Sequence, residues 1–223
     1  MIAEMLISDS VPSVSLQDTG SKVLSMMDVF RLPHLPVVNG QEYFGVISDK
    51  LIFDAGDFDE PIGKFSADQL LTPHVHPQQH IFEVAAVASG CAVSVVPVLA
   101  EDHSYLGSIS KYDLCTSLIT LFSPDEPGGI MELAMCERDY SLSQITQIIE
   151  GNDARILSLY TWKPAGSTTE LIVTIKVNKV DLSGILQTLS RYNYDIRATF
   201  MDQTPLTNLI DDRFDQFMRY MNT

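Results

Sequence analysis

The sequence contains little cysteine, and its spacing argues against cross-links or metal binding. There are three cysteines, Cys91, Cys115 and Cys136, an odd number with no CxxC spacing. Neither a disulfide framework nor a zinc knuckle is supported by this pattern. The three thiols are therefore predicted to be core residues.

Positive charge is scarce. Lys and Arg number 14 against 29 Asp and Glu, which gives a formal net charge of -15. Such a surface repels polyanions, so neither nucleic acid nor an anionic membrane is expected as a partner. A small phosphate-bearing ligand stays compatible with this charge if a local pocket supplies hydrogen-bond donors.

Long hydrophobic runs are also missing. No stretch approaches the roughly 20 apolar residues that span a bilayer. The first ten residues, "MIAEMLISDS", have no basic region ahead of an apolar run, as a secretory signal would. We expect a soluble, cytoplasmic protein.

The chain has no histidine after His103. Ser110 and Cys115 are candidate nucleophiles, but nucleophilic catalysis needs a base within hydrogen-bond reach. The sequence therefore predicts a protein that is not an enzyme and requires no cofactor.

What the sequence does contain is an internal repeat. The stretches "VPSVSLQDTGSKVLSMM" and "TPHVHPQQHIFEVAAVA" align at an offset of 61 residues, and "HLPVV" aligns with "VVPVL". After a one-residue gap, "YFGVISDKLIFD" aligns with "YLGSISKYDLCT", which pairs Gly45 with Gly107 and Ser48 with Ser110. Each copy is predicted to form a short strand, a helix, two strands joined by a turn, and a closing helix.

A different pattern follows "SPDEPGG", which cannot continue a helix or a central strand. Its periodicity predicts βαββαβ, the split βαβ or ferredoxin-like arrangement. The last segment has apolar residues on one face of a predicted helix. The predicted fold is α+β, with copy one at 1–60, copy two at 61–122, the βαββαβ domain at 129–200 and an amphipathic helix at 201–223. The residues of that helical face are Leu206, Leu209, Ile210, Phe217, Met218 and Met221.

The two copies resemble a tandem pair of CBS domains (cystathionine-β-synthase type), each with "LPVV" or "VPVL" followed by Gly-hydrophobic-hydrophobic-Ser. The third unit resembles an ACT domain, and the whole order resembles regulatory proteins of the acetoin-utilisation type. The resemblance implies a ligand that contains adenosine, such as AMP, ATP, NAD or S-adenosylmethionine. It also implies that Ser110 and Asp113 bind the ribose.

Two hypotheses for Ser110 and Asp113 stay open. A hydroxyl and a carboxylate three residues apart in the first turn of a helix share a face, and they can bind the diol of a ribose while free N–H groups attract phosphate. Ser-x-x-Asp is also the pattern of a capping box. In copy one the aligned residues are Ser48 and Leu51, so the carboxylate is missing there.

Other residues are candidates for the same ligand site. Lys111 and His34 could contact phosphate, although a surface lysine and a structural histidine are the favoured explanations. His74 shares a strand face with His76, which indicates a half-exposed face beside a ligand groove rather than a metal site. Adenine would lie between apolar strand edges, where the candidates are Val75, Val96, Pro97 and Ile109.

The ACT-like unit has "ERDYSL" where ACT domains often have a glycine that admits an amino acid. Tyr140 occupies the glycine position and would fill that space. This favours a dimerisation unit. The expected protein is a regulatory sensor that binds an adenine nucleotide and acts on an unidentified protein partner through a homodimer; the alternative is a ligand-free dimeric interaction scaffold with degenerate CBS and ACT sites.

Overall fold

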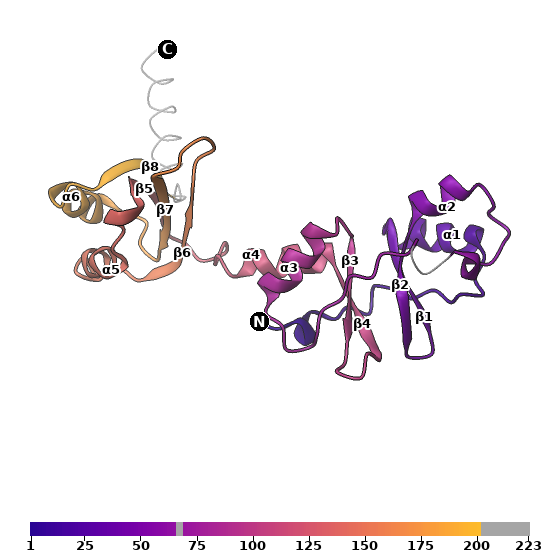
Figure 1. Cartoon of the computed structure of the whole chain (residues 1–223). Helices are drawn as coiled ribbons and strands as arrows, with labels where there is room; N and C mark the ends of the chain where they lie inside the picture. The colour runs from indigo at the N-terminus through magenta and orange to yellow at the C-terminus, as the bar shows by residue number, and fades with distance from the viewer. Residues whose placement is uncertain (66–68, 202–223) are drawn as a thin grey trace, which may run out of the picture. The chain divides into compact units, whose positions relative to one another are not determined.

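The computed structural model describes residues 1–65 and 69–201. The chain forms two compact units, Met1–Ile119 and a second unit that begins at Thr120 (Figure 1). Met201 is the last residue of a strand, and residues 202–223, which hold the rest of the predicted C-terminal helix, lie outside the described residues. In the described part of the chain, no helix is long and apolar enough to cross a membrane.

The first unit is built from two similar halves, and its element order agrees with the predicted repeat. The predicted first strand of each copy is present as a single bridging residue, Val14 beside Val37 and Val75 beside Val98. The elements are η1 (Ala3–Leu6), α1 (Gly20–Phe30), β1 (His34–Asn39), β2 (Glu42–Ser48), α2 (Asp49–Ala55), η2 (Ile62–Lys64), α3 (Ile81–Gly90), β3 (Val95–Leu99), β4 (Tyr105–Ser110) and α4 (Lys111–Thr120).

Each half contains one antiparallel hairpin with an irregular register at equivalent places. The shift falls between Val37 and Val38 in the β1–β2 hairpin and between Val98 and Leu99 in the β3–β4 hairpin. The turns use positive φ angles, which are 64° at Gly40 and 63° at His103. The sequence repeat is therefore also a repeat of backbone geometry.

The glycines of the two motifs mark where another segment crosses the hairpin. Gly45 and Gly107 have φ angles of 147° and 155°, which L side chains rarely adopt. A Cβ at Gly45 would lie 2.8 Å from the Leu71 carbonyl oxygen, and a Cβ at Gly107 would collide with the Ile7 side chain. Each crossing segment lies near the start of the other copy, because Ile7 is in the first residues of copy one and Leu71 in the first residues of copy two.

The two halves consequently exchange parts of their hydrophobic cores. Ala3 and Leu6 are buried with the residues of copy two, whereas Ile62 and Leu70 are buried with those of copy one. A third small cluster, Val11 with Val46 and Val95, joins both copies. The domain boundary between residues 60 and 61 therefore stays a prediction.

The second unit is a four-stranded antiparallel sheet with the order β6-β7-β5-β8. Its elements follow the predicted order βαββαβ, the split βαβ arrangement, with a short turn η3 after the first strand. Its relation to ACT domains stays a prediction. The elements are β5 (Gly129–Cys136), η3 (Glu137–Asp139), α5 (Leu142–Glu150), β6 (Ile156–Trp162), β7 (Glu170–Val177), α6 (Ser183–Arg191) and β8 (Asp195–Met201).

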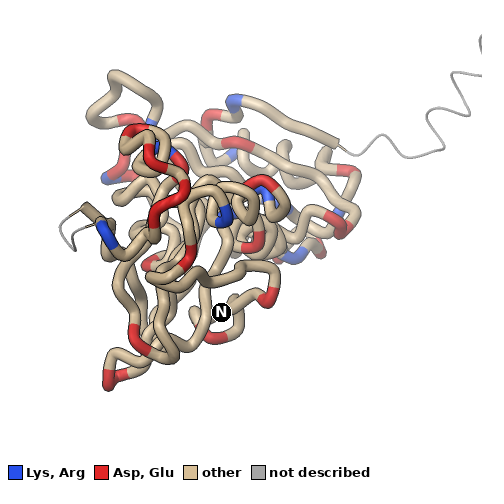
Figure 2. The backbone as a smooth tube through the Cα atoms, turned by 90° about the vertical axis from the view of Figure 1, so that its right-hand side faces the viewer, with Lys and Arg blue, Asp and Glu red and all other residues tan. Residues whose placement is uncertain are grey.

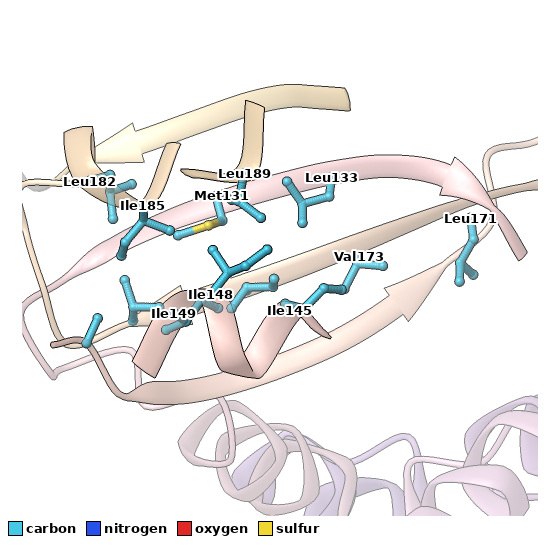
Figure 3. Close-up of a cluster of buried hydrophobic side chains, with 13 residues drawn as sticks. Met131, Leu133, Ile145, Ile148, Ile149, Leu171, Val173, Leu182, Ile185 and Leu189 are labelled. Atoms are coloured by element: carbon cyan, nitrogen blue, oxygen red, sulfur yellow. The ribbon is translucent and has the colours of Figure 1, made fainter. Parts of the chain in front are cut away.

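One face of this sheet is packed against both helices (Figure 3). Ser141 caps α5, since its side chain accepts a hydrogen bond from the Gln144 backbone N–H. Ile145 and Ile149 are spaced by one helical turn and are fully buried against the strands, together with Leu189 of α6. The opposite face of the sheet has no helix from α5 or α6.

Acidic residues outnumber basic ones along the chain, as the backbone view in Figure 2 shows. The prediction of core thiols is wrong, because Cys91 and Cys115 are exposed and Cys136 is only partly buried. Cys91 follows the last residue of α3, and Cys115 lies on the solvent side of α4, where the helical period places it away from buried Leu114.

Core exchange makes a testable prediction at the N-terminal segment. Leu6→Ala removes a buried side chain from the core of copy two, so we expect the free energy of unfolding to fall by about 2–3 kcal/mol. Met5→Ala, next to it and exposed, is the control and should change stability little. Urea unfolding followed by circular dichroism measures both; equal effects of the two substitutions would contradict the exchanged core.

Candidate functional site

The centre of the candidate site is the pair Ser110 and Asp113. Ser110 is the last residue of β4 and is 4% exposed, and Asp113 lies half-buried in the first turn of α4. The Ser110 hydroxyl accepts a hydrogen bond from the Asp113 backbone N–H at 3.0 Å and donates one to Asp113 Oδ2 at 2.6 Å. The serine thereby orients the carboxylate and leaves Oδ1 unused by this contact.

A complete capping box elsewhere in the same copy allows a direct comparison. At the start of α3, the His80 side chain accepts a backbone N–H, while Glu83 Oε2 accepts the His80 backbone N–H at 2.8 Å. At α4, the serine side chain also accepts a backbone N–H, but the Asp113 carboxylate accepts a hydrogen bond from the serine hydroxyl and not from the serine backbone N–H. Ser110 therefore caps α4 and, in addition, orients the Asp113 carboxylate.

The start of α2 in copy one shows that the cap alone does not need a carboxylate. Ser48 accepts a hydrogen bond from the Leu51 backbone N–H at 3.1 Å, as Ser110 does from Asp113. The Leu51 side chain packs against the core of copy one. The copies thus share the helix cap and differ in the carboxylate.

His34 lies at the seam between the two copies. Its Nδ1 lies 3.2 Å from the Ser94 hydroxyl, and the Ser94 carbonyl accepts the Lys111 backbone N–H at 2.8 Å. Burial lowers the pKa of His34, and the nearby Asp49 charge opposes this shift. A chain of hydrogen bonds therefore links a histidine of copy one to the residue that follows Ser110.

Ser94 is the residue that sequence reasoning missed. It aligns with Pro33 of copy one, whose carbonyl accepts the Asp49 backbone N–H at 3.0 Å in the equivalent contact. A hydroxyl in copy two at a position held by proline in copy one was a signal in the alignment. Its importance depends on contact with His34, which is 60 residues away in sequence.

The other polar candidates lie at the surface. The side chains of Lys111 and His74 are exposed. His74 Nδ1 lies 3.2 Å from the Thr72 carbonyl oxygen, and its ring lies 5.8 Å from that of His76 and 6.4 Å from that of His103. Within residues 1–65 and 69–201, no group of three or more His, Cys, Asp or Glu is arranged to hold a metal ion.

The apolar candidates are core residues. Val75, Val96 and Ile109 are fully buried in the cluster of copy two, and Pro97 is buried as well. The side chains of Val75, Val96 and Ile109 pack into that core and are not exposed to a ligand. A cavity of about 310 Å³ in the first unit lies beside α1 and α2 of copy one instead, where its lining includes Pro33, Asp49 and Phe53.

In the second unit, the loop that resembles an ACT ligand turn is occupied by its own tyrosine. Tyr140 is partly buried and packs against the core of that unit. Arg138 and Asp139 beside it are exposed. The packing gives a physical reason for the prediction that this loop does not admit an amino acid.

No protein-family model matches the chain. Solved structures to which it is similar include a CBS domain pair/ACT domain protein from Thermotoga maritima, at 21% identity and a TM-score of 0.48 over 54% of this chain and 98% of that one. Another is a candidate acetoin utilization protein (AcuB) from Vibrio cholerae, at 20% identity and a TM-score of 0.49 over 56% and 96%. CBSX2 in complex with AMP is 13% identical, with a TM-score of 0.45 over 53% and 96%. The function proposed below rests on the residues of this chain.

The depressed pKa of His34 predicts a pH dependence of stability. The unfolded state binds a proton near the ordinary histidine pKa of about 6.5, while the folded state resists it. His34 therefore contributes stability above this pH, and the contribution is lost as the pH falls below it. When the pH is lowered from about 7.5 to about 5.5, we expect the melting temperature of His34→Asn to fall less than that of the wild type.

The matched control is His103→Asn, because His103 is exposed and asparagine tolerates its positive φ. This variant should keep the wild-type dependence on pH. Thermal melts of the ligand-free protein at both pH values check the prediction, and identical slopes for His34→Asn and the wild type would contradict it.

Proposed function

We propose that this protein is a non-catalytic regulatory sensor that binds an adenosine-containing small molecule at the start of α4. The candidates are AMP, ATP, NAD and S-adenosylmethionine. The observation that supports the proposal is the Asp113 carboxylate, which is oriented by Ser110 although the equivalent cap in copy one works without it. A feature that the helix cap does not need requires another explanation, and ligand binding supplies one.

The chemistry of this turn suits a ribose. A carboxylate accepts hydrogen bonds from both hydroxyls of a vicinal diol, and charge-assisted bonds of this kind are stronger than neutral ones. Asp113 offers Oδ1 for this purpose, while Ser110 holds the group in place through Oδ2. The early N–H groups of α4 favour a nearby phosphate. The exposed Lys111 side chain follows Ser110 directly and would add positive charge.

The seam offers a route from the ligand to the rest of the unit. The residue after Ser110 is hydrogen-bonded to Ser94, and Ser94 contacts His34 of copy one. A ligand that binds one arrangement of this seam better than another shifts the population toward it. We infer that the output passes to a protein partner, because the Ser110 hydroxyl donates its hydrogen bond to a carboxylate, which is a weak base, and Ser110 is therefore not set up as a nucleophile.

A second candidate function is a ligand-free dimeric scaffold, favoured by exposed apolar side chains on the helices of the first unit. Tyr112 of α4 is 78% exposed, and Phe30, Phe53 and Ile119 are also exposed on α1, α2 and α4. Large apolar side chains on helical surfaces are typical of an interface. A homodimer that forms through these helices is compatible with both functions. Ligand binding is therefore the observation that distinguishes the sensor from the scaffold.

The sensor makes a prediction for ligand-dependent melting. A ligand at about 100 times its dissociation constant stabilises the folded state by about 2.7 kcal/mol, so one of AMP, ATP, NAD or S-adenosylmethionine should raise the melting temperature. Asp113→Ala should abolish this rise, because it removes the carboxylate that holds the ribose. A thermal-shift screen of the wild type and the variant measures both.

Glu83→Ala is the matched control for that screen. Glu83 is the carboxylate at the same position of another first helical turn in copy two, where it completes the capping box of α3. Its removal should lower the ligand-free melting temperature and leave the ligand-induced rise intact. If no ligand raises the melting temperature, or if the rise survives in Asp113→Ala, the sensor is refuted and the scaffold is favoured.

The proposed homodimer predicts a change of mass in solution. Phe53→Asp combined with Tyr112→Asp places charge on two exposed apolar positions, so we expect dissociation to the monomer. Lys50→Glu, an exposed charge reversal on α2, should leave the dimer intact. Sedimentation equilibrium checks this, and an unchanged dimer in the double variant would show that the interface lies elsewhere.

A further inference from the structure

The face of the second unit's sheet that lies opposite α5 and α6 is here called the open face. The strand register places its side chains in three cross-strand rows, because alternate residues of each strand share a face. The central strand β7 is buried on this face too, since Ile172 is fully buried and Lys176 is 9% exposed. The rows are Ser158, Lys176, Ile130 and Phe200; Tyr160, Thr174, Glu132 and Ala198; and Trp162, Ile172, Ala134 and Asp195.

A groove with a volume of about 410 Å³ lies at the first row. Its walls are largely aromatic: the rings of Phe122 and Tyr160 lie 5.3 Å apart, and Phe200 stands on the other side. Phe122, Tyr160 and Phe200 are all more than two-fifths exposed. Aromatic side chains gathered around a concave surface are unusual for a face in contact with water alone.

The floor of the groove is fixed by a buried lysine. Lys176 Nζ donates hydrogen bonds to the carbonyl oxygens of Ser123 at 2.6 Å and Pro124 at 3.0 Å. These bonds hold the segment that enters the second unit across the first row. The Ser158 hydroxyl donates to the Phe122 carbonyl at 3.2 Å and adds to the same anchoring. The groove is therefore a preformed feature of the fold.

The chain itself continues from the edge of this groove. Met201, the last described residue, lines it, and 22 residues follow to Thr223. Those residues carry the apolar set from Leu206 to Met221 at helical spacing. Eighteen residues in a helix would span about 27 Å with a diameter of about 10 Å. The three rows extend over about 14 Å along the strands and about 14 Å across them.

We propose that residues 204–221 dock on the open face of their own chain as an amphipathic helix, with the part of the apolar set nearest Met201, which includes Leu206, Leu209 and Ile210, over the three rows. The same chain is favoured over a second copy because the tether is only a few residues long. A short tether gives an effective concentration in the millimolar range, so a weak apolar contact is populated without a partner. The second unit would then have helices on both faces of its sheet.

The single tryptophan of the chain reports on this face. Trp162 lies in the third row, is 39% exposed, and donates its indole N–H to Thr174 Oγ1 at 3.3 Å. Docking would shield its ring. In the full chain, the double substitution Leu209→Ser and Ile210→Ser should release the helix. We expect the emission of Trp162 to shift to longer wavelength and its quenching by acrylamide to increase.

The control is Asp212→Ser with Asp215→Ser, which changes residues on the side of the predicted helix opposite the apolar set. This variant should match the wild type. Trypsin cleavage after Arg213 is an independent readout, because docking protects the segment, and only the apolar variant should be cut faster. Circular dichroism confirms that the sheet is intact in both variants.

Two results would overturn the proposal. One is an apolar variant whose Trp162 emission, quenching and cleavage all equal those of the wild type, since the face is then uncovered in the native protein. The other is that Trp162 of the wild type is protected from quenching at high protein concentration and loses this protection on dilution, because the face is then covered by a second copy. Protection that is independent of concentration and lost only in the apolar variant supports docking within one chain.

Discussion

The first unit depends on one steric constraint, the passage of a chain segment directly over a glycine in each hairpin. Gly45 is crossed by the segment at Leu71, and Gly107 by the segment at Ile7. Any side chain at either glycine would displace the segment or strain the backbone. Apolar residues in or near each segment also pack in the core of the copy that the segment crosses. Leu6 packs in the core of copy two, and Ile62, near the other segment, packs in the core of copy one. Neither copy completes its core alone, so a change at one copy is felt by the other.

The exchanged segments explain how two similar copies can have different roles. The shared parts, which are the crossed glycine and the serine cap, serve the fold in both copies. The differing part is the carboxylate of Asp113, which Ser110 orients in copy two and Leu51 replaces in copy one. The His34–Ser94 contact then joins the two copies next to that difference. Under the proposed function, one copy holds the ligand and the other responds to it.

Much of the fold could be predicted because its signals are local. The repeat, the turn at Gly40 and the caps at Ser48, Ser110 and Ser141 depend on residues within a few positions of one another. The core exchange and the Ser94 contact depend on residues far apart in sequence, and no local pattern indicates them. The exposure of Cys91 and Cys115 was missed because the cysteine count limits disulfides and says nothing of position. Strand alternation alone also could not show that Val75 and Ile109 face the core rather than a ligand.

The central claim is that copy two alone carries the carboxylate for a ribose-containing ligand. The most direct measurement is the binding stoichiometry by isothermal titration calorimetry, with the adenosine ligand that stabilises the protein most. The account predicts one ligand per chain, because Leu51 leaves copy one without the carboxylate. Two ligands per chain with similar affinity would contradict it, since binding would then not depend on Asp113 chemistry.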